Sequence, residues 1–342
     1  MKYLGLDAHS KTCEVAAVDE RGKVLRNRSF ETSEHELIEE VRAISGRKAL
    51  AVEECPLASW VHTIIKPYVD ELIVCDPKQN KWIAASEGKD DRVDAIKLAQ
   101  LLRGGYLKPV YHSDDGRQKF KELVLHYHDL SRQVTRFKNK IKAKFRRNGI
   151  RCDGNEIYAP GNREGWLKKL GHKETAFAVE NLYFGLDSVT TLKQRAKREI
   201  VKMAPRYPEI RLFKGIPGVG LIVASTVSAI VATPSRFSKK SKLWTYAGLG
   251  IKRRSSADVS SPAHLNRNYN RTLKYVLKLA ATRAISKANN EFATKYKTLC
   301  DRGLDPSVAK VTVARSILSA MYGMWKKGEA YRPRTDNESS LN

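Results

Sequence analysis

The chain has 342 residues, and its 63 lysines and arginines against 37 aspartates and glutamates give a formal net charge of +26. Hydrophobic residues make up 42% and charged residues 29%, a globular composition that excludes disorder or a collagen-like fibre. The length suggests two or three domains, and no apolar run approaches the roughly 20 residues that span a bilayer.

The five cysteines are scattered, without a CxxC pair or the framework of a disulfide-rich protein. The opening residues show no apolar stretch of the secretory kind, since Asp7 and Lys11 interrupt it. Both features favour a reducing, cytoplasmic setting.

Charge is segregated along the chain. Residues 1–110 carry 17 basic and 18 acidic side chains, whereas the remainder carries 46 basic and 19 acidic ones. Such asymmetry is typical of a surface that binds a polyanion, and nucleic acid is the first candidate. An anionic membrane is the second, but the sequence shows neither an amphipathic anchor nor a lipidation motif, so we expect no membrane partner.

The first 112 residues predict an α/β domain. Short apolar runs bounded by turn residues predict five strands, and the order β-β-β-α-β-α-β-α is that of an RNase H-like (RuvC-like) sheet. The spacing of Ser33 and Glu36 is that of a capping box at a helix start. The strands are expected at 3–7, 14–18, 24–30, 49–52 and 71–75, and the helices after Ser33, at about 57–65, and from Asp91 to the stop at Gly104-Gly105.

Residues 113–208 predict a basic coiled-coil helical hairpin. Apolar residues recur at alternating spacings of three and four, a heptad pattern, and a weaker repeat follows after a segment rich in turn formers. The stretch 116–150 holds eleven basic residues and only two acids. The first seam comprises Phe120, Leu123, Tyr127, Leu130, Val134, Phe137 and Ile141; the basic residues expected to bind nucleic acid are Lys138, Lys140, Lys142, Lys144, Arg146 and Arg147.

Residues 209–302 predict a mostly α-helical C-terminal domain, and 303–342 a last helix with a polar tail. The motif IPGVG, at 216–220, is typical of a helix-hairpin-helix, in which Gly218 and Gly220 let backbone N–H groups approach a phosphate. An ordinary helix-linking turn is the alternative, and the basic setting favours the phosphate site.

Four carboxylates stand where an RNase H-like fold would gather them. Asp7 ends the first strand, Glu53 ends the fourth, and Asp91 and Asp94 open a helix at a spacing that points both the same way. Carboxylates so close repel one another unless cations lie between them, and oxygen ligands favour Mg²⁺ or Mn²⁺. Taken alone, each acid is explained by an ordinary structural role, in a turn, on the surface or at a helix start. Taken together, the four acids favour a two-metal site for phosphodiester chemistry. The spacing alone does not distinguish Glu53 from its neighbour Glu54, or Asp91 from its neighbour Asp90, as members of this site.

A basic loop carries candidate hydroxyl nucleophiles. Lys252, Arg253 and Arg254 precede Ser255-Ser256, so a serine could attack a phosphodiester while the cations stabilise the developing charge. Taken alone, a serine in such a loop is more typical of a solvated linker or a phosphate contact.

The chain resembles the DEDD/serine transposases of bacterial insertion sequences, the bridge-RNA-guided DNA recombinases. YLGLDAHS is similar to the family's first-strand motif, and KDDRVDA, at 89–95, resembles Lys-Thr-Asp-Arg-Ile-Asp-Ala. Glu53-Glu-Cys-Pro56 is similar to Glu-x-Thr/Cys-Gly, with Pro56 in place of the glycine. IPGVG, YAGLG and Ser256 follow the family's order, although Ala257 replaces a glycine and Ile251 a proline.

The resemblance implies a fold, a chemistry and partners. It selects Glu53 over Glu54, and Asp91 with Asp94 over Asp90, as the residues that hold Mg²⁺ (or Mn²⁺) with Asp7. It also implies that Ser256 forms a covalent phosphoserine intermediate. The implied partners are donor and target DNA, a structured non-coding guide RNA and further copies in a dimer or tetramer; the setting is the bacterial cytoplasm, at the nucleoid.

Two alternatives remain open. A junction-resolving RNase H-like endonuclease would use metal-activated water, and Ser256 would then be structural. A non-catalytic nucleic-acid-binding scaffold would have no use for the acids, so Asp7→Ala or Asp91→Ala would leave its function intact.

Overall fold

A computed structural model describes residues 1–77, 91–113, 116–252, 255–256, 259–260, 264–265 and 268–333; for 91–92, and for the strand residues between 251 and 265, it describes the backbone alone. The chain divides into two compact units, Met1–Gln118 and Lys119–Asn342. It is mixed α/β and mostly helical. The first division lies close to the predicted boundary at 112, whereas the divisions predicted at 208 and 302 fall inside the second unit and stay predictions.

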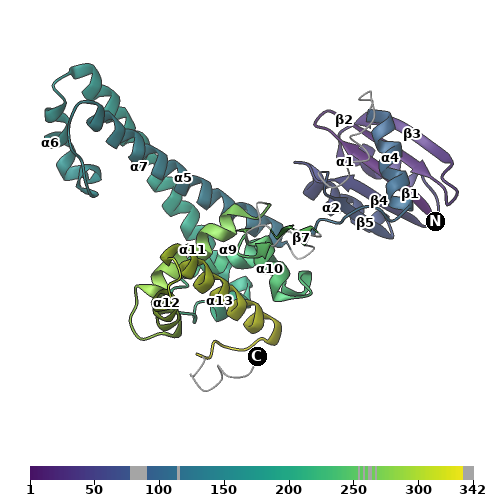
Figure 1. Cartoon of the computed structure of the whole chain (residues 1–342). Coiled ribbons are helices and arrows are strands. Elements are labelled where there is room, and N and C mark those ends of the chain that lie inside the picture. The colour runs from purple at the N-terminus through teal and green to yellow at the C-terminus, as the bar shows by residue number, and fades with distance from the viewer. Residues whose placement is uncertain are drawn as a thin grey trace. The chain divides into compact units, whose positions relative to one another are not determined.

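A five-stranded sheet in the order β3-β2-β1-β4-β5 forms the first unit (Figure 1). β1 pairs antiparallel with β2 and parallel with β4, which pairs parallel with β5. The order of strands and helices is the one that the sequence predicted and agrees with an RNase H-like fold. The elements are β1 (Lys2–Ala8), β2 (Thr12–Val18), β3 (Val24–Glu31), α1 (Glu34–Arg42), β4 (Lys48–Glu53), α2 (Ala58–Ile65), β5 (Glu71–Cys75) and α4 (Asp91–Arg103).

The sheet is covered on both faces because side chains alternate along each strand. Leu4 and Leu6 of β1 are fully buried in a cluster with residues of α1 and α2. On the other face, Leu98 and Leu102 of α4 are buried with Ala51 of β4. The start of α1 is capped as predicted, since Ser33 Oγ accepts the Glu36 N–H at 3.1 Å.

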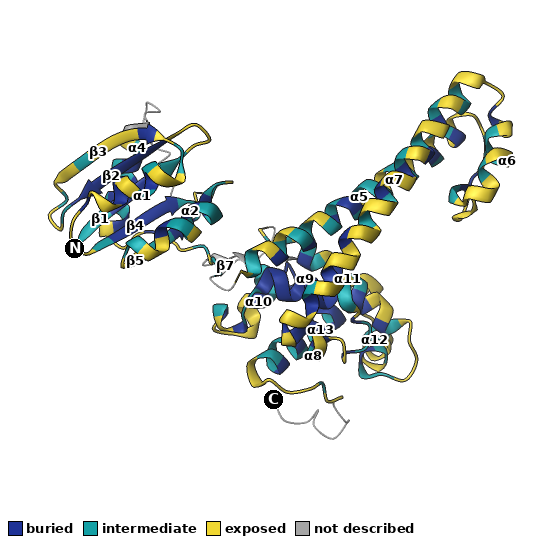
Figure 2. Cartoon of the chain, turned by 180° about the vertical axis from the view of Figure 1, so that it is seen from behind, coloured by how far each residue is buried: buried dark blue, intermediate teal, exposed yellow. Residues whose placement is uncertain are grey.

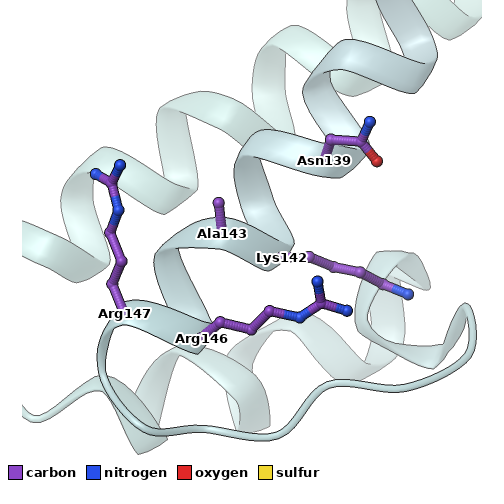
Figure 3. Close-up of a pocket in the computed structure, with 5 residues that line it drawn as sticks. All are labelled: Asn139, Lys142, Ala143, Arg146 and Arg147. Carbon is purple, nitrogen blue, oxygen red and sulfur yellow. The ribbon is translucent and has the colours of Figure 1, made fainter.

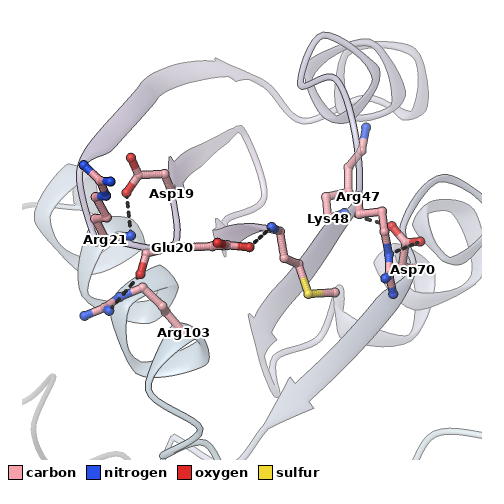
Figure 4. A network of polar contacts seen from close by, with 8 residues as sticks. Asp19, Glu20, Arg21, Arg47, Lys48, Asp70 and Arg103 are labelled. Carbon is pink, nitrogen blue, oxygen red and sulfur yellow. Dashed lines mark hydrogen bonds and ion pairs between the residues drawn. The ribbon is translucent and has the colours of Figure 1, made fainter.

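Polar contacts hold the last turn of α4 against the turn between β2 and β3. Gln100 Nε2 donates to the Gly22 carbonyl at 2.7 Å. Arg103 Nη1 donates to the Glu20 carbonyl at 3.3 Å, as Figure 4 shows. Asp19 shapes that turn by accepting the Arg21 and Lys23 backbone N–H groups. Because this turn lies where β1 begins, α4 runs back along the sheet with its first turn toward the end of β1.

Two long helices, α5 (Arg117–Arg147) and α7 (Lys173–Met203), run antiparallel in the second unit (Figure 1). The start of α5 is buried with the end of α7 through Phe120 and Ile200. Further along, Phe145 is buried with Val179 from the start of α7. The hairpin between them holds the short helix α6 (Arg163–Leu167), and Gly185 permits close approach, since a Cβ there would lie 2.5 Å from the Phe137 ring.

The buried face of α5 is wider at its start than the predicted heptad seam. Val124 and His128 lie outside that seam and are buried, whereas the seam residue Leu123 is only half-buried. The cause is a third partner, because the start of α5 also packs on the helices that follow: His128 contacts Thr226 and the Tyr275 ring.

The other helices enclose a separate core. α9 is buried over Val223–Val231, so it lies at the centre of this cluster (Figure 2). The last helix, predicted within 303–342, is α13 (Pro306–Lys327). The helices are α8 (Pro208–Phe213), α9 (Leu221–Val231), α10 (Lys240–Tyr246), α11 (Arg271–Ile285), α12 (Glu291–Asp301) and α13 (Pro306–Lys327).

Two small antiparallel pairs of strands lie between α10 and α11. These strands were not predicted from the sequence, because each has only two residues and no apolar alternation. β6 (Ile251–Lys252) pairs with β9 (His264–Leu265), and β7 (Ser255–Ser256) pairs with β8 (Val259–Ser260). Among the described helices, none is both long and apolar enough to cross a membrane.

Candidate functional site: an acid edge and a basic helical unit

Two acids lie at the carboxyl ends of neighbouring parallel strands: Asp7 is the next-to-last residue of β1, and Glu53 is the last residue of β4. The β1–β4 register pairs Leu6 with Val52, so Asp7 and Glu53 are the next residues on the two strands. In-register residues of a parallel pair point to the same face, which here is the face of Gly5 and Ala51, opposite to Leu6. Asp7 and Glu53 therefore share one edge of the sheet and its α4 face.

Helix α4 reaches this edge because β1 has a glycine beneath it. A Cβ at Gly5 would lie 2.1 Å from the Ala95 carbonyl oxygen and 2.6 Å from the Ala99 nitrogen, so only glycine allows the observed approach. Ala95 follows Asp94, and the helix begins at Asp91. The first turn of α4 thus brings Asp94, and the backbone of Asp91, toward the carboxyl end of β1, where Asp7 lies.

The described acids of this edge are partly exposed and have basic neighbours. His9 Nε2 lies 3.1 Å from Asp7 Oδ2, and Lys97 Nζ lies 3.4 Å from Asp94 Oδ1. About a quarter of the Asp7 side chain (25%) and a third of the Asp94 side chain (32%) remain exposed. Both carboxylates are open to a ligand from solvent.

The complete set of four acids is not tested by the structure. The Asp91 side chain and the whole of Asp90 lie outside the described residues. Among the side chains that are described, no three acids, histidines or cysteines form a group that would hold a metal ion. The four-acid metal site therefore stays a prediction.

Glu54, which spacing left open, has a different partner. Alternation along the strand end turns Glu54 away from the face of Glu53. Its Oε2 lies 2.7 Å from His112 Nε2, and the His112 ring stacks on His62 at 5.3 Å. The geometry thus favours Glu53 as the acid of the edge.

One acid of this edge was missed by the sequence analysis. Glu14 of β2 pairs directly with Asp7 across the antiparallel β1–β2 ladder, so both side chains lie on the α4 face. Glu14 is 8% exposed, and its Oε2 is buried without a hydrogen-bond partner in the described part of the chain. The available signal was a single acid in the otherwise apolar run CEVAAV, seven residues after Asp7.

The predicted nucleophile lies on the small strand pairs of the second unit. Ser256 pairs with Val259, and Lys252 pairs with His264, but the structure describes only the backbone at these positions. Arg253 and Arg254 lie outside the described residues. Neither the choice between Ser255 and Ser256 nor the contacts of the cations is tested.

The base of this segment is closed by described contacts. The Asn270 N–H donates to the Tyr246 carbonyl at 2.9 Å. Arg315 of α13 donates to the Leu249 carbonyl from Nε at 3.0 Å and from Nη2 at 2.8 Å. Helices α10, α11 and α13 therefore hold both ends of the segment that carries Ser256.

The two glycines of the IPGVG turn lie in different surroundings. Gly218 has a φ of +83°, and a Cβ there would lie 2.3 Å from the Ala280 carbonyl oxygen of α11, so this glycine is required for packing. Gly220 is exposed and precedes the first turn of α9, where the nearest atom to a Cβ would be Arg283 Nη1 at 3.9 Å. A helix start beside a guanidinium suits an anion, which the sequence analysis expected of both glycines.

The basic residues of α5 line a hollow near the end of the helix. It has a volume of about 500 Å³ and is lined by Asn139, Lys142, Ala143, Arg146 and Arg147 (Figure 3). Lys142 Nζ donates to the Gly154 carbonyl at 2.7 Å, whereas Arg146 and Arg147 are exposed. Of the other predicted cations, Lys140 is exposed, Lys144 is half-buried and Lys138 stacks on the Tyr158 ring.

Comparisons with known proteins cover both units. Residues 4–147 match the "Transposase" family of the DEDD, IS110 type, and residues 210–297 match the "Transposase IS116/IS110/IS902 family". The putative transposase y4qE of Sinorhizobium fredii (strain NGR234) is 22% identical over 305 residues, 80% of this chain and 74% of that protein. The "Insertion element IS110 uncharacterized 43.6 kDa protein" of Streptomyces coelicolor is 27% identical over 156 residues, 46% of this chain and 38% of that protein.

Proposed function

The chain belongs to the IS110 family of insertion-sequence transposases, and we propose that it cuts and rejoins DNA by attack of Ser256 on a phosphodiester. The observation that carries the proposal is the acid edge: Asp7 and Glu53 follow the last paired residues of adjacent strands, beside the first turn of α4. A binding scaffold would have no need to gather acids in an otherwise basic protein.

Divalent cations fit this edge by the chemistry of its donors. Asp7, Glu53, Asp91 and Asp94 would hold Mg²⁺ or Mn²⁺, because these ions prefer carboxylate oxygens. Bound there, such cations activate a nucleophile and stabilise the leaving oxygen of a phosphodiester. The buried Oε2 of Glu14 on the same face has no hydrogen-bond partner among the described residues, and this supports the fit, since a buried carboxylate oxygen needs a counter-charge.

The proposed reaction proceeds by exchange at phosphorus. The Oγ of Ser256 forms a bond to phosphorus while the bond from phosphorus to a deoxyribose oxygen breaks, and the hydroxyl proton ends on that oxygen. Lys252, Arg253 and Arg254 stabilise the charge that develops on the phosphate oxygens. Attack by the free hydroxyl of another strand then releases the serine and returns a proton to it, so no net bond energy is lost.

The nucleic-acid partners in this proposal are donor and target DNA and a structured non-coding guide RNA. Two described features support phosphate contacts: the exposed cations around the α5 hollow and the start of α9 beside Arg283. The guide RNA and an assembly of two or four copies follow from the family resemblance.

A covalent-adduct assay tests the reaction. The protein, its RNA, Mg²⁺ and a suicide DNA substrate should yield a protein–DNA species that survives denaturation. Ser256→Ala should abolish it, and the matched control Ser255→Ala should retain it. Intact cleavage by Ser256→Ala without any adduct would show instead a hydrolytic nuclease that uses metal-activated water; loss in Ser255→Ala alone would move the nucleophile to Ser255.

A further inference from the structure

Glu14 lies beside the acid edge by strand register. In the antiparallel β1–β2 ladder it is the direct partner of Asp7, and the Cβ atoms of such partners lie about 4.5–5.5 Å apart. Asp7 is in turn the neighbour of Glu53 on the parallel side. Three adjacent strands, β2, β1 and β4, therefore each place one carboxylate on the same face.

Glu14 differs from its neighbours in burial. It is 8% exposed, and Oε2 contacts neither solvent nor any hydrogen-bond donor of the described residues. An ionised carboxylate in such a place is costly unless it is paired. Native proteins rarely leave a buried side-chain oxygen without a partner, so the missing partner requires an explanation.

The cations of the neighbouring strand are not that partner. Arg26 and Arg28 of β3 form ion pairs with Glu40 of α1, at 2.6 and 2.8 Å. They lie on the face of α1 and α2, because the β2–β3 register pairs Arg28 with Val15 and not with Glu14. Glu14 pairs across this ladder with Ser29, whose side chain carries no charge.

We propose that Glu14 is a fifth carboxylate of the metal site. The described acids do not form a metal-holding group in this structure, and Oε2 of Glu14 binds the divalent cation held by Asp7 once that cation draws the side chains together. This inference rests on the proposed function and extends its set of metal-binding residues to β2. Without the cation, Glu14 adds a further carboxylate to the edge, and its Oε2 is buried with no hydrogen-bond partner in the described part of the chain. The same side chain should therefore destabilise the metal-free protein and strengthen metal binding.

The experiment measures both effects on the full-length chain without nucleic acid. Mn²⁺ binding is followed by isothermal titration calorimetry, and thermal unfolding is recorded with EDTA and with Mn²⁺. Glu14→Gln keeps the shape and removes the charge. Its matched control is Glu40→Gln, which removes a buried carboxylate of the same unit that is already ion-paired. Asp7→Asn reports on the metal site itself.

The expected pattern separates the variants. Glu14→Gln should weaken Mn²⁺ binding by about tenfold or more, raise the melting temperature in EDTA and reduce the further rise on adding Mn²⁺. Glu40→Gln should lower the melting temperature and leave Mn²⁺ affinity unchanged. Should Glu14→Gln fail to fold, Glu14→Asp, which shortens the side chain and keeps the charge, should also weaken Mn²⁺ binding.

The results that overturn the proposal are distinct. Unchanged Mn²⁺ affinity in Glu14→Gln, with binding lost in Asp7→Asn, removes Glu14 from the site and leaves the proposed function standing. A lower melting temperature of Glu14→Gln in EDTA, with unchanged Mn²⁺ affinity, makes Glu14 a structural residue. Absence of saturable Mn²⁺ binding by the parent chain overturns the metal chemistry together with this inference.

Discussion

At the scale of single residues, Gly5 controls how α4 meets the acid edge. Its missing side chain leaves the space in which the α4 backbone crosses β1. We expect Gly5→Ala to destabilise the protein by ~1–3 kcal/mol, as overpacking does, and to reduce adduct formation by displacing Asp94. Denaturant unfolding and the adduct assay measure the two effects.

The matched control for that substitution is Gly165→Ala, since a Cβ at Gly165 meets nothing within 4 Å and the residue lies within α6. It should leave both stability and adduct formation unaltered or slightly improved. Equal behaviour of the two alanine variants would contradict the role assigned to Gly5.

His128 gives the second unit a dependence on pH. Its Nε2 lies 2.8 Å from Thr226 Oγ1, and that hydroxyl donates its own proton to the Ile222 carbonyl at 2.6 Å. The hydroxyl oxygen therefore accepts a hydrogen bond from the Nε2–H of the neutral ring. Burial, with smaller contributions from Arg132 and Lys193, lowers the pKa of His128 from 6.5 to about 4.

The sign of the effect follows from linkage. Between pH 6.5 and about 4 the unfolded chain binds more protons at His128 than the folded chain does. The contribution of the neutral His128 ring to the free energy of unfolding is therefore complete above pH 6.5 and is lost as the pH falls toward 4. When the pH is lowered from 7.5 to 5, we expect the free energy of unfolding of the parent chain to fall by about 2 kcal/mol more than that of the His128→Gln variant. Parallel pH profiles in denaturant unfolding would refute this.

At the scale of elements, the basic end of α5 is the nucleic-acid contact that is simplest to test. Arg146 and Arg147 are exposed at the hollow, so replacing both with glutamine removes two charges without disturbing the core. RNA and DNA binding should weaken, and the slope of log K against log salt should fall by roughly 2, one for each phosphate that is no longer neutralised. Fluorescence anisotropy over a salt series measures this slope.

The control for α5 removes the same charge elsewhere in the second unit. Lys168 and Lys202 are already ion-paired, with Glu164 and Glu199, at 2.8 and 2.7 Å. Lys168→Gln with Lys202→Gln should change the slope much less. If both double variants lost the same amount of nucleic-acid affinity and salt dependence, binding would depend on the overall charge of the protein and not on the hollow.

At the scale of the whole molecule, the parts of the fold that depend on local signals were predictable. Short apolar runs bounded by turn residues predicted the five strands of the first unit, and the spacing of Ser33 and Glu36 predicted a helix start. The buried face of α5 could not be predicted, because Thr226 and Tyr275, which bury His128, are distant in sequence. The two-residue strands around Ser256 carry no periodic signal at all.

In the candidate site, too, some residues could be predicted from local sequence signals and others could not. Asp7, Glu53 and Asp94 could be proposed because strand ends and a helix start are visible in the sequence. For Glu14 the sequence offers only a lone acid in an apolar run. Its importance comes from its pairing with Asp7 and from a buried oxygen without a hydrogen-bond partner among the described residues, which are properties of the folded sheet. The positions of the basic loop residues in space stay predictions.

The hydrogen bonds at the base of the segment that follows Leu249 have a consequence for how the sequence of this segment can change during evolution. Arg315 and Asn270 hold its base through the backbone carbonyls of Leu249 and Tyr246, and a carbonyl is present whatever the side chain. Mutational drift at Leu249 or Tyr246 therefore leaves these two anchors chemically intact, apart from changes in packing. The sequence between these two anchors can therefore change during evolution, and with it the substrate, while the hydrogen bonds that attach the segment to its supporting helices are kept.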